Sequence, residues 1–326
     1  MKKLLPFLLF VAFLLMFSVS AAPTETDAAN SLYALGLVQG YGSTGDRFGL
    51  ADNLTRAQAV ILLERYLGVE EAAKAETAKA PFDDVPAWAD AYVSYAVANN
   101  LVAGKKDAAG RVYFDADAPI SEPEFLTLML RAMGYTDKND GSGDFVWSDP
   151  FTLAGKLGMT EHTAASVAFK RGDAFVICIG ALTAETKSGK IVADRLMEQN
   201  VFTERQYTRA KKIAAGEKIT VLCVGDSITQ GTGAKNQANN YPNQLQKLLG
   251  DGYKVVNCGK ASSYVMSPKS AYNVKASKPA LWYPATAQYA TAMRTDADIV
   301  IVMLGTNDGR SMSGKGAEND FVADYK

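Results

Sequence analysis

Three short polar segments in the last third of the chain carry residue types that could perform acyl transfer. Ser227 stands in Gly-Asp-Ser, Gly259 follows an apolar run, and Asn307 stands in Gly-Thr-Asn-Asp. A serine hydroxyl can attack an ester carbonyl, and N–H donors can stabilise the oxyanion that forms. We therefore expect Ser227 to be a nucleophile. Its own N–H, the Gly259 N–H and the Asn307 side-chain amide are the expected oxyanion donors.

Each of these polar segments follows an apolar run that predicts a buried strand. The runs cover 219–224, 254–257 and 299–304, and helical stretches at 241–249 and 284–294 separate them. Alternation of strand and helix is typical of a parallel, doubly wound α/β sheet, which binds its ligands at the carboxyl ends of the strands. The sequence therefore places the three segments at one edge of one sheet.

Two carboxylates beside these segments are interpreted as turn-organising residues. Asp226 precedes the serine and Asp308 follows the asparagine, where a carboxylate can accept hydrogen bonds from backbone N–H groups. The serine turn lacks the G-x-x-x-x-G-K-[ST] pattern of a P-loop. It has some similarity to a flavodoxin phosphate loop, but that alternative leaves 305–308 without a role. An ordinary turn serine and an ordinary turn glycine are the simplest alternatives for Ser227 and Gly259.

Together, the three motifs resemble those of the SGNH (GDSL-type) hydrolases. The resemblance covers 219–326 and implies a flavodoxin-like, three-layer α/β domain. It implies ester hydrolysis through an acyl-enzyme, with Ser227 as nucleophile and Gly259 and Asn307 as oxyanion donors. The segment looks most like the carbohydrate O-acetylesterases of this superfamily. No cofactor or metal is implied.

The same resemblance implies a catalytic histidine. Family members carry this base in an Asp-x-x-His motif after the last strand, whereas the single histidine of this chain, His162, precedes the serine. We interpret His162 as a polar residue of a loop or helix start. The expectation from sequence is therefore a catalytic domain that is incomplete at its C-terminus and has little or no activity by itself.

The chain before residue 206 contains an imperfect threefold repeat. Thr-Arg-Ala-Gln at 55–58 and Ser-Glu-Pro-Glu at 121–124 are capping-box patterns before apolar helical sets, and 170–173 is a weaker third copy. Such repeats bury their core between copies. The expected boundaries are a leader at 1–22, a repeat region at 27–205 with copies at about 27–70, 80–136 and 144–200, a linker at 206–218, and the hydrolase part at 219–326.

The segments 35–41 and 82–89, together with the first capping box, resemble S-layer homology repeats. This resemblance implies an all-α unit that binds secondary cell-wall polysaccharide of a Gram-positive-type envelope. It implies Arg56 and Arg171 as the cations that bind acidic, pyruvylated sugars, and Trp88 as a stacking surface. The second copy has Glu122 where the others have arginine. The alternatives are a solvated Arg56 at a helix start and a Trp88 that fills the core.

Composition and the first residues indicate a secreted, globular chain. The 326 residues are 48% hydrophobic, and 34 Lys and Arg balance 35 Asp and Glu, which argues against a nucleic-acid partner. Lys2 and Lys3 precede an apolar run and small residues up to Ala22, the order of a secretory signal. An uncleaved N-terminal anchor is the alternative. We expect no stable membrane span after cleavage.

The three cysteines, Cys178, Cys223 and Cys258, lie in apolar stretches and are interpreted as buried thiols. A bridge between Cys223 and Cys258 is the less favoured alternative.

The sequence thus predicts a secreted, wall-anchored serine esterase that acts on acylated carbohydrate. A second hypothesis is a non-catalytic surface protein whose working part is the repeat region. A purely structural S-layer subunit would leave the polar segments at the strand ends unexplained.

Overall fold

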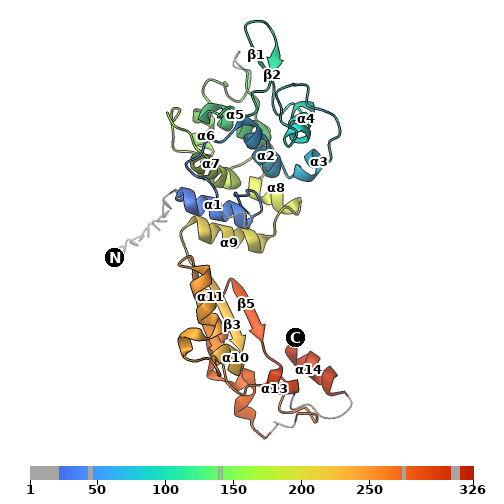
Figure 1. The fold of residues 1–326 in the computed structure, drawn as a ribbon, viewed down its shortest axis with the longest axis vertical. Helices are drawn as coiled ribbons and strands as arrows, with labels where there is room; N and C mark the ends of the chain where they lie inside the picture. Colours follow the sequence, from blue (N-terminus) through green and yellow to red (C-terminus); the bar gives the residue numbers. More distant parts are fainter. Residues whose placement is uncertain (1–21, 43–46, 139, 141, 274–276, 310–315) are drawn as a thin grey trace, which may run out of the picture.

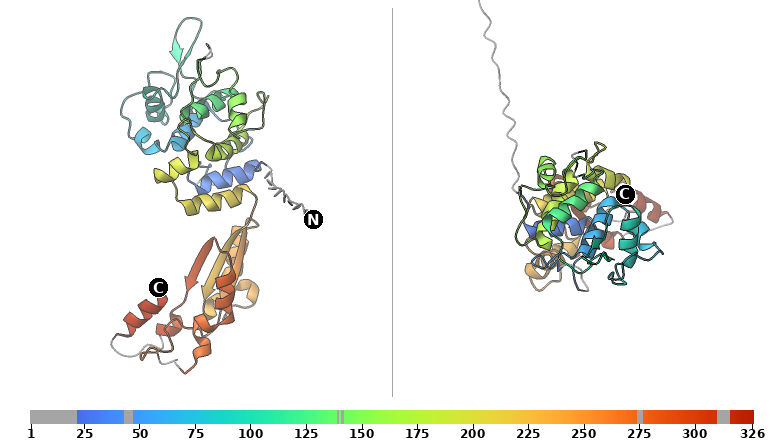
Figure 2. Two further views of the ribbon diagram at one scale, coloured as in Figure 1. Left: turned by 180° about the vertical axis from the view of Figure 1, so that it is seen from behind. Right: turned by 90° about the horizontal axis from the view of Figure 1, so that it is seen from above.

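The molecule consists of a helical part and a sheet-containing part that are joined at residues 215–218 (Figure 1). The left view of Figure 2 shows the same division from behind. The structure is a computed structural model that describes residues 22–42, 47–138, 140, 142–273, 277–309 and 316–326. The expected leader lies outside these residues except for Ala22. Within the described residues, no helix is long and apolar enough to cross a membrane.

The helical part contains one small hairpin, so it is not entirely helical as the sequence suggested. Its two strands pair in antiparallel fashion around a turn in which the Asp107 carboxylate accepts the N–H groups of Ala109 and Arg111, both at 2.9 Å. The elements are α1 (Glu25–Ala34), α2 (Arg56–Leu67), α3 (Glu70–Lys74), α4 (Asp90–Ala98), β1 (Lys105–Lys106), β2 (Val112–Tyr113), α5 (Glu122–Ala132), α6 (Phe151–Lys156), α7 (Arg171–Thr183), α8 (Val192–Glu198) and α9 (Glu204–Ala214).

The predicted capping boxes start two of the repeated helices. Thr55 and Gln58 form the box of α2, and Ser121 and Glu124 form the box of α5. In α7 the Asp173 carboxylate accepts the N–H of the residue before the helix at 2.8 Å. Each helix therefore begins where a side chain satisfies N–H groups that have no partner inside the helix.

The starts of α2, α5 and α7 interlock in a cycle, which we call the repeat ring. The Arg56 N–H donates to a carbonyl of the loop before α5 at 3.0 Å, and the Arg171 N–H donates to a carbonyl of the loop before α2 at 3.0 Å. The Glu122 carboxylate accepts an N–H of the loop before α7 at 2.7 Å. Each capped helix is thus held by the loop that leads into the next one.

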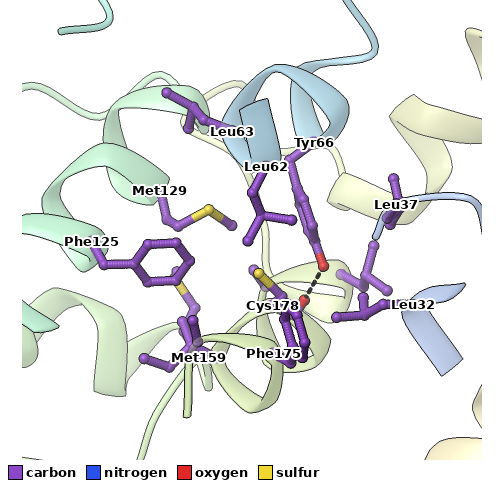
Figure 3. Packing of buried hydrophobic residues seen from close by; sticks show 14 of the residues in the cluster. Leu32, Leu37, Leu62, Leu63, Tyr66, Phe125, Met129, Met159, Phe175 and Cys178 are labelled. Atoms are coloured by element: carbon purple, nitrogen blue, oxygen red, sulfur yellow. Dashed lines mark hydrogen bonds between the residues drawn. The ribbon is translucent and has the colours of Figure 1, made fainter. Parts of the chain in front are cut away.

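The largest hydrophobic core lies inside the helical part, between α1, α2, α5 and α7 (Figure 3). Within it, the buried Tyr66 hydroxyl of α2 donates to the Cys178 carbonyl of α7 at 2.7 Å. Burial raises the pKa of the Cys178 thiol to about 12. All three cysteines are free and buried, which confirms the interpretation from sequence.

Most of the predicted linker is helical. Helix α9 begins at a capping box of Thr203 and Gln206 and continues to Ala214. Ala210 is buried, and its carbonyl accepts the Ser31 hydroxyl of α1 at 2.8 Å. The lysine-rich, alanine-rich composition of this segment resembles a linker, but its apolar positions pack on α1. Only 215–218 lie between the two parts.

The sheet-containing part has three parallel strands in the order β4-β3-β5, which confirms the predicted strands and their parallel pairing. The strands are β3 (Ile219–Gly225), β4 (Tyr253–Gly259) and β5 (Ile299–Met303). Gly225 is in register with Gly259 on one side and Met303 on the other, so the three carboxyl ends are level. The other elements are α10 (Ser227–Gln230), η1 (Gln237–Asn239), α11 (Tyr241–Leu249), η2 (Pro279–Leu281), η3 (Tyr283–Ala285), α12 (Ala287–Arg294), α13 (Thr306–Gly309) and α14 (Ala317–Tyr325).

Helices pack on both faces of this sheet, although Val300 and Val302 of β5 remain about half exposed. On one face, Leu222 and Val224 pack in a cluster with Ala292 of α12. Because side chains alternate along a strand, Cys223 points to the other face, where it interacts with Tyr241 at the start of α11. This arrangement agrees with the predicted α/β layers and leaves the carboxyl edge of the sheet to the polar segments.

Candidate functional site

Ser227 is the first residue of α10 and follows β3 through a sharp turn. Asp226 caps this helix, since its Oδ1 accepts the Ile228 N–H at 3.0 Å. The Asp226 carboxylate is fully buried, and its Oδ2 has no hydrogen-bond partner among the described residues. The left-handed Gly231 ends the helix after one turn. The nucleophile candidate is therefore partly exposed on a turn whose two ends are fixed.

Glycine is required where β4 meets this turn. A Cβ atom at Gly259 would collide with the backbone nitrogen of Gln230 in α10. A Cβ atom at Gly225 would likewise collide with the Thr229 side chain. The two glycines allow the ends of β3 and β4 to lie directly against the short helix that carries Ser227.

The Gly259 N–H, an oxyanion donor in the sequence-based expectation, already has a partner. It donates to Asn257 Oδ1 at 2.9 Å, and the residue is buried. The Asn257 amide group also donates to the Thr229 carbonyl at 2.9 Å. Asn257 thus ties the end of β4 to α10, the helix that begins with Ser227.

Asn307 lies in α13, directly after β5, at the same edge of the sheet as Ser227. Its Nδ2 donates to the Ser263 carbonyl in the loop after β4 at 2.9 Å. The neighbouring Asp308 is buried, and its Oδ1 accepts the N–H groups of Val265 at 2.9 Å and Met266 at 2.8 Å. The Gly-Thr-Asn-Asp segment therefore holds the loop after β4 through the side chains of Asn307 and Asp308.

The single histidine is remote from this edge. His162 lies in the loop before α7, and its Nδ1 is 2.7 Å from Oε1 of the fully buried Glu122. No group of three or more His, Cys, Asp or Glu residues that could hold a metal ion occurs in the described part of the chain.

In the helical part, Arg56 forms the floor of a groove between α2 and α5. Its Nε donates to the Phe114 carbonyl and its Nη1 to Glu124 Oε1, both at 3.0 Å. Its guanidinium also lies 5.1 Å from the centre of the Phe114 ring. The groove has a volume of about 610 Å³, and Lys105, Arg131 and Trp147 are part of its lining. Three cations therefore line the groove, and Glu124 and Asp137 partly neutralise them, since Asp137 pairs with Arg131 at 2.7 Å.

Arg171 occupies the corresponding position in a smaller groove between α7 and α2, of about 230 Å³. Its Nε donates to the Phe48 carbonyl at 3.0 Å and its Nη1 to Gln58 Oε1 at 3.1 Å. The guanidinium lies 5.2 Å from the Tyr41 ring centre and 5.4 Å from that of Phe175. In both grooves the arginine therefore donates to the loop before the next capped helix and to that helix's capping residue.

The third junction of the repeat ring differs because Glu122 replaces the arginine. Its carboxylate binds His162 and accepts the Ser166 N–H at 2.7 Å. At this junction the loop before α7 therefore contacts a carboxylate, whereas the other two junctions have a guanidinium at the corresponding position.

The two exposed tryptophans of the helical part lie in different surroundings. Trp88 is 51% exposed, which argues against a core-filling role, but it lies outside the linings of both grooves. Trp147 is 57% exposed and lines the Arg56 groove. Sequence reasoning missed Trp147, Lys105 and Arg131, because they stand outside the repeated motif and only the fold brings them to the groove.

Comparison with known families identifies the sheet-containing part. Residues 223–325 match the model of the GDSL-like lipase/acylhydrolase family. The C-terminal region is a GDSL-like acylhydrolase domain. This match confirms the SGNH (GDSL-type) hydrolase type expected from the sequence, and the domain contains both Ser227 and Asn307.

Relatives fall into two groups that match different shares of the chain. A cell surface protein of Thermoanaerobacter kivui is 30% identical over 187 residues, which are 56% of this chain and 23% of that protein. A middle cell wall protein of Brevibacillus brevis is 30% identical over 197 residues, 58% of this chain and 17% of that protein. An acetylxylan esterase of Xylanibacter ruminicola is 36% identical over 95 residues, 29% of this chain and 18% of that protein. The chain thus spans less than a quarter of each of these relatives.

The fold brings Ser227 and Asn307 to the carboxyl edge of the sheet in the GDSL-like domain. His162 lies apart from them, in the helical part. Asp226 and Asp308 bind backbone N–H groups there, as turn-organising residues do. Asn257, which sequence reasoning did not single out, links two of the expected elements. Its sequence signal is weak, because an asparagine at the end of a strand is common near any turn.

Proposed function

We propose that this chain is a cell-surface ester hydrolase whose GDSL-like domain removes acyl groups, O-acetyl above all, from carbohydrate. The observation that carries the proposal is the placement of Ser227 and Asn307 at the carboxyl ends of the adjacent strands β3 and β5, inside the family match. The acetylxylan esterase relative supports an acetylated glycan as substrate.

In the proposed reaction, the Ser227 hydroxyl oxygen bonds to the acyl carbon and the carbonyl electron pair moves onto oxygen. N–H donors at this edge, including the Asn307 amide, stabilise that oxyanion. The tetrahedral intermediate then collapses: the bond between the acyl carbon and the sugar oxygen breaks, and that oxygen takes up a proton and leaves as a hydroxyl group. Water then hydrolyses the acyl-enzyme and releases the acid. The serine proton needs an acceptor, and residues 219–326 contain no histidine. We therefore expect slow turnover from these 326 residues, about 10³–10⁴ above the uncatalysed rate at most.

Ser227→Ala is expected to remove the enzymatic part of this slow rate. Release of acetate from acetylated xylan and of nitrophenol from p-nitrophenyl acetate measures it, with and without added imidazole. Imidazole can accept the serine proton, so it should accelerate the unsubstituted protein beyond the imidazole-only background, and should not do so in Ser227→Ala. The exposed Ser188→Ala in the helical part is the control. Equal rates in the wild type and Ser227→Ala would contradict the proposal.

For the helical part, we propose binding of an acidic cell-wall polysaccharide in the Arg56 and Arg171 grooves, which would hold the enzyme at the cell surface after secretion. The cationic floors support an anionic ligand, because guanidinium groups bind carboxylates well. Exposed Trp147 offers a flat apolar surface for a sugar ring. The names of the surface and cell-wall relatives support this location.

Trp147→Ala is expected to weaken binding to purified cell-wall polysaccharide about tenfold, equivalent to about 1.4 kcal/mol. Trp88→Ala is the matched comparison, since both side chains are about half exposed, 57% and 51%. It should bind like the wild type because Trp88 lies outside both grooves. Titration calorimetry or a wall pull-down measures this. If Trp88→Ala weakened binding and Trp147→Ala did not, Trp88 would be the sugar-stacking residue, as expected from the sequence.

A non-catalytic surface protein is the second candidate, favoured by the surface and cell-wall relatives, which match a larger share of this chain than the acetylxylan esterase does. It predicts wall binding that depends on Trp147 or Arg56 and no reaction that depends on Ser227, so the two experiments above distinguish the candidates.

A further inference from the structure

We propose that Glu64 is a pH-sensitive switch for the Arg56 groove. When protonated, it allows α3 and α4 to pack on α2 and complete the groove. When ionised, it drives α3 and α4 away from α2, and the groove loses one side. The inference rests on the polysaccharide binding proposed above for this groove and adds its regulation. Neither the family match, which begins at residue 223, nor the names of the relatives bear on Glu64.

Glu64 lies on the face of α2 that packs on α4. Helical spacing places it one turn after Val60 and two turns after Ala57, and both of these residues belong to a hydrophobic cluster between the two helices. The buried members of this α2–α4 cluster are Ala57, Val60, Ala89, Val93, Ala96, Val102, Phe114 and Ala116. Helix α3 follows α2 directly and packs on both α2 and α4 (Figure 1). The Glu64 side chain thus faces the place where three helices meet.

The Glu64 carboxyl group is poorly suited to carry a charge in this place. It is completely buried, and among the described residues neither of its oxygens has a hydrogen-bond partner. Ionisation would therefore leave an unpaired charge in apolar surroundings. Burial accordingly raises the pKa of Glu64 to about 8, and the Glu70 carboxylate of α3 adds to the rise. Opening of the helix contact relieves this cost, because it gives the carboxylate access to water.

The cations on the surrounding helices are bound to other acceptors in the described part of the chain. The pairs are Arg56 with Glu124, Arg65 and Lys74 with Glu70, Arg131 of α5 with Asp137, and Arg195 of α8 with the carbonyls of Tyr66 and Ala132. The other titratable groups are Tyr66 of α2, Glu71 of α3, Asp90, Tyr92 and Tyr95 of α4, Glu122 of α5, and Asp194 and Glu198 of α8. An ionised Glu64 would thus meet the Glu70 carboxylate with no cation left to compensate it.

The α2–α4 cluster also forms one side of the Arg56 groove. Val60, Val102 and Phe114 belong to the cluster and line the groove, as does Lys105 of β1 for the groove alone. The Arg56 guanidinium donates from Nε to the Phe114 carbonyl at 3.0 Å. Because Val102 and Phe114 follow α4 in the chain, movement of α4 away from α2 would displace this side of the groove. It would also displace the carbonyl that orients Arg56.

The contact between α2 and α4 is small enough to open while the rest of the helical part stays folded. Four of the eight buried members of the α2–α4 cluster are alanines. Regions with few buried apolar contacts open locally at a lower free energy than the whole molecule unfolds. The hydrogen bonds of the repeat ring lie outside 70–98, so they can persist in the open form.

The direction of the pH dependence follows from the raised pKa. In the open form the carboxyl group titrates near its ordinary value of 4.5, whereas in the closed form it titrates near 8. The open form therefore loses the proton first as the pH rises. Between these two values, each pH unit should favour opening by up to about tenfold.

Hydrogen exchange followed by mass spectrometry at pH 5, 6, 7 and 8 tests the opening, with Glu64→Gln as the uncharged variant. Comparison of the two proteins at each pH removes the intrinsic pH dependence of exchange. We expect 70–98 to exchange equally fast in both proteins at pH 5, and at least about tenfold faster in the wild type at pH 8. In the wild type at pH 8, α1 and α7 should remain protected. Loss of protection in all helices together would overturn the inference, because the opening would not be local.

Titration calorimetry with purified cell-wall polysaccharide tests the coupling to the groove. The Kd values of the wild type and Glu64→Gln should agree at pH 5. At pH 8 the wild type should bind about threefold more weakly, which corresponds to about two thirds of the molecules being open. Titration of the polymer or of the groove itself affects both proteins alike and cancels in the ratio.

Two further variants control for the substitution itself. Glu71→Gln changes a carboxylate of α3 that is 87% exposed, so it should follow the wild type at every pH. Glu64→Met is also uncharged and similar in length, so it should follow Glu64→Gln and replaces that variant if glutamine prevents folding.

The outcomes separate the switch from the polysaccharide binding on which it rests. Binding in both proteins with a Kd ratio that does not change with pH would overturn the switch and leave the binding proposal intact. Faster exchange of 70–98 in the wild type without a change in the Kd ratio would show that α4 opens without affecting the groove, which also overturns the switch. Binding in neither protein at any pH would overturn the binding proposal, and with it the regulatory role of Glu64.

Discussion

Glu64→Gln is expected to make the helical part more stable than the wild type at neutral pH, by about 3 kcal/mol at pH 7. Glu64 lies in α2, is completely buried, and has no hydrogen-bond partner for either carboxylate oxygen among the described residues. Burial, with a smaller contribution from the Glu70 carboxylate, raises its pKa to about 8. Glutamine resembles the protonated acid in shape and polarity but cannot ionise.

The sign of the pH dependence follows from this raised pKa. The folded state holds the Glu64 proton more tightly than the unfolded chain, whose carboxyl titrates near 4.5. The stabilising contribution is therefore complete below that value, and it is lost as the pH rises through about 8. Between these values the free energy of unfolding of the wild type should fall by up to about 1.4 kcal/mol per pH unit relative to the variant.

Urea unfolding of both proteins at pH 5, 6, 7 and 8 measures this difference, which should be small at pH 5 and largest at pH 8. Glu71→Gln is the matched control, because that side chain lies in the following helix α3 and is 87% exposed. Its difference from the wild type should stay nearly constant with pH. A Glu64→Gln difference that is equally flat would show that the carboxyl is ionised in the folded state or reaches water.

Asp308→Ala is expected to destabilise the GDSL-like domain by about 2–5 kcal/mol. The Asp308 carboxylate binds the N–H groups of Val265 and Met266, and both residues are buried, so neither N–H would gain water in exchange. Each unsatisfied buried N–H costs about 1–3 kcal/mol. The loop after β4 would lose one of its two attachments to α13, and only the Asn307 hydrogen bond to the Ser263 carbonyl would remain.

Asp308→Asn provides the matched control. Because one oxygen, Oδ1, accepts from both Val265 and Met266, an amide oxygen in the same place can keep both bonds. This variant should therefore retain most of the stability. Hydrogen exchange of 260–283 and urea unfolding of the domain measure the effect, with the exposed Asp296→Ala as a surface control. Unchanged exchange of that loop in Asp308→Ala would rule out the anchoring role.

Features set by residues close together in the sequence could be predicted, whereas features set by contacts between distant segments could not. The central strand β3 was predictable because a strand buried on both faces demands a continuous apolar run, and 219–224 is such a run. The run 299–304 is equally apolar, although Val300 and Val302 are about half exposed. Capping boxes were predictable because their partners are three residues apart. Helix α9 was missed because its exposed face is rich in lysine, while the contact that orders it, Ala210 on α1, joins distant segments.

The candidate site shows the same limit at the level of single atoms. Ser227 and Asn307 could be predicted, since their position after a strand implies a shared edge. The partner of the Gly259 N–H could not, because it depends on how the end of β4 closes against α10. The difference between Trp88 and Trp147 is likewise set by the fold, which brings only the latter to the Arg56 groove.

The repeat ring has a consequence for how such units can be gained or lost. In an open stack of repeats, the free energy of unfolding is roughly a sum over the copies and their interfaces. An end copy can therefore be removed at a modest cost in stability. Here the start of α2 is held before α5, α5 before α7, and α7 before α2, so no copy is an end copy. Deleting any one copy would leave one of the two remaining helix starts without its support. We therefore expect the three copies to unfold together.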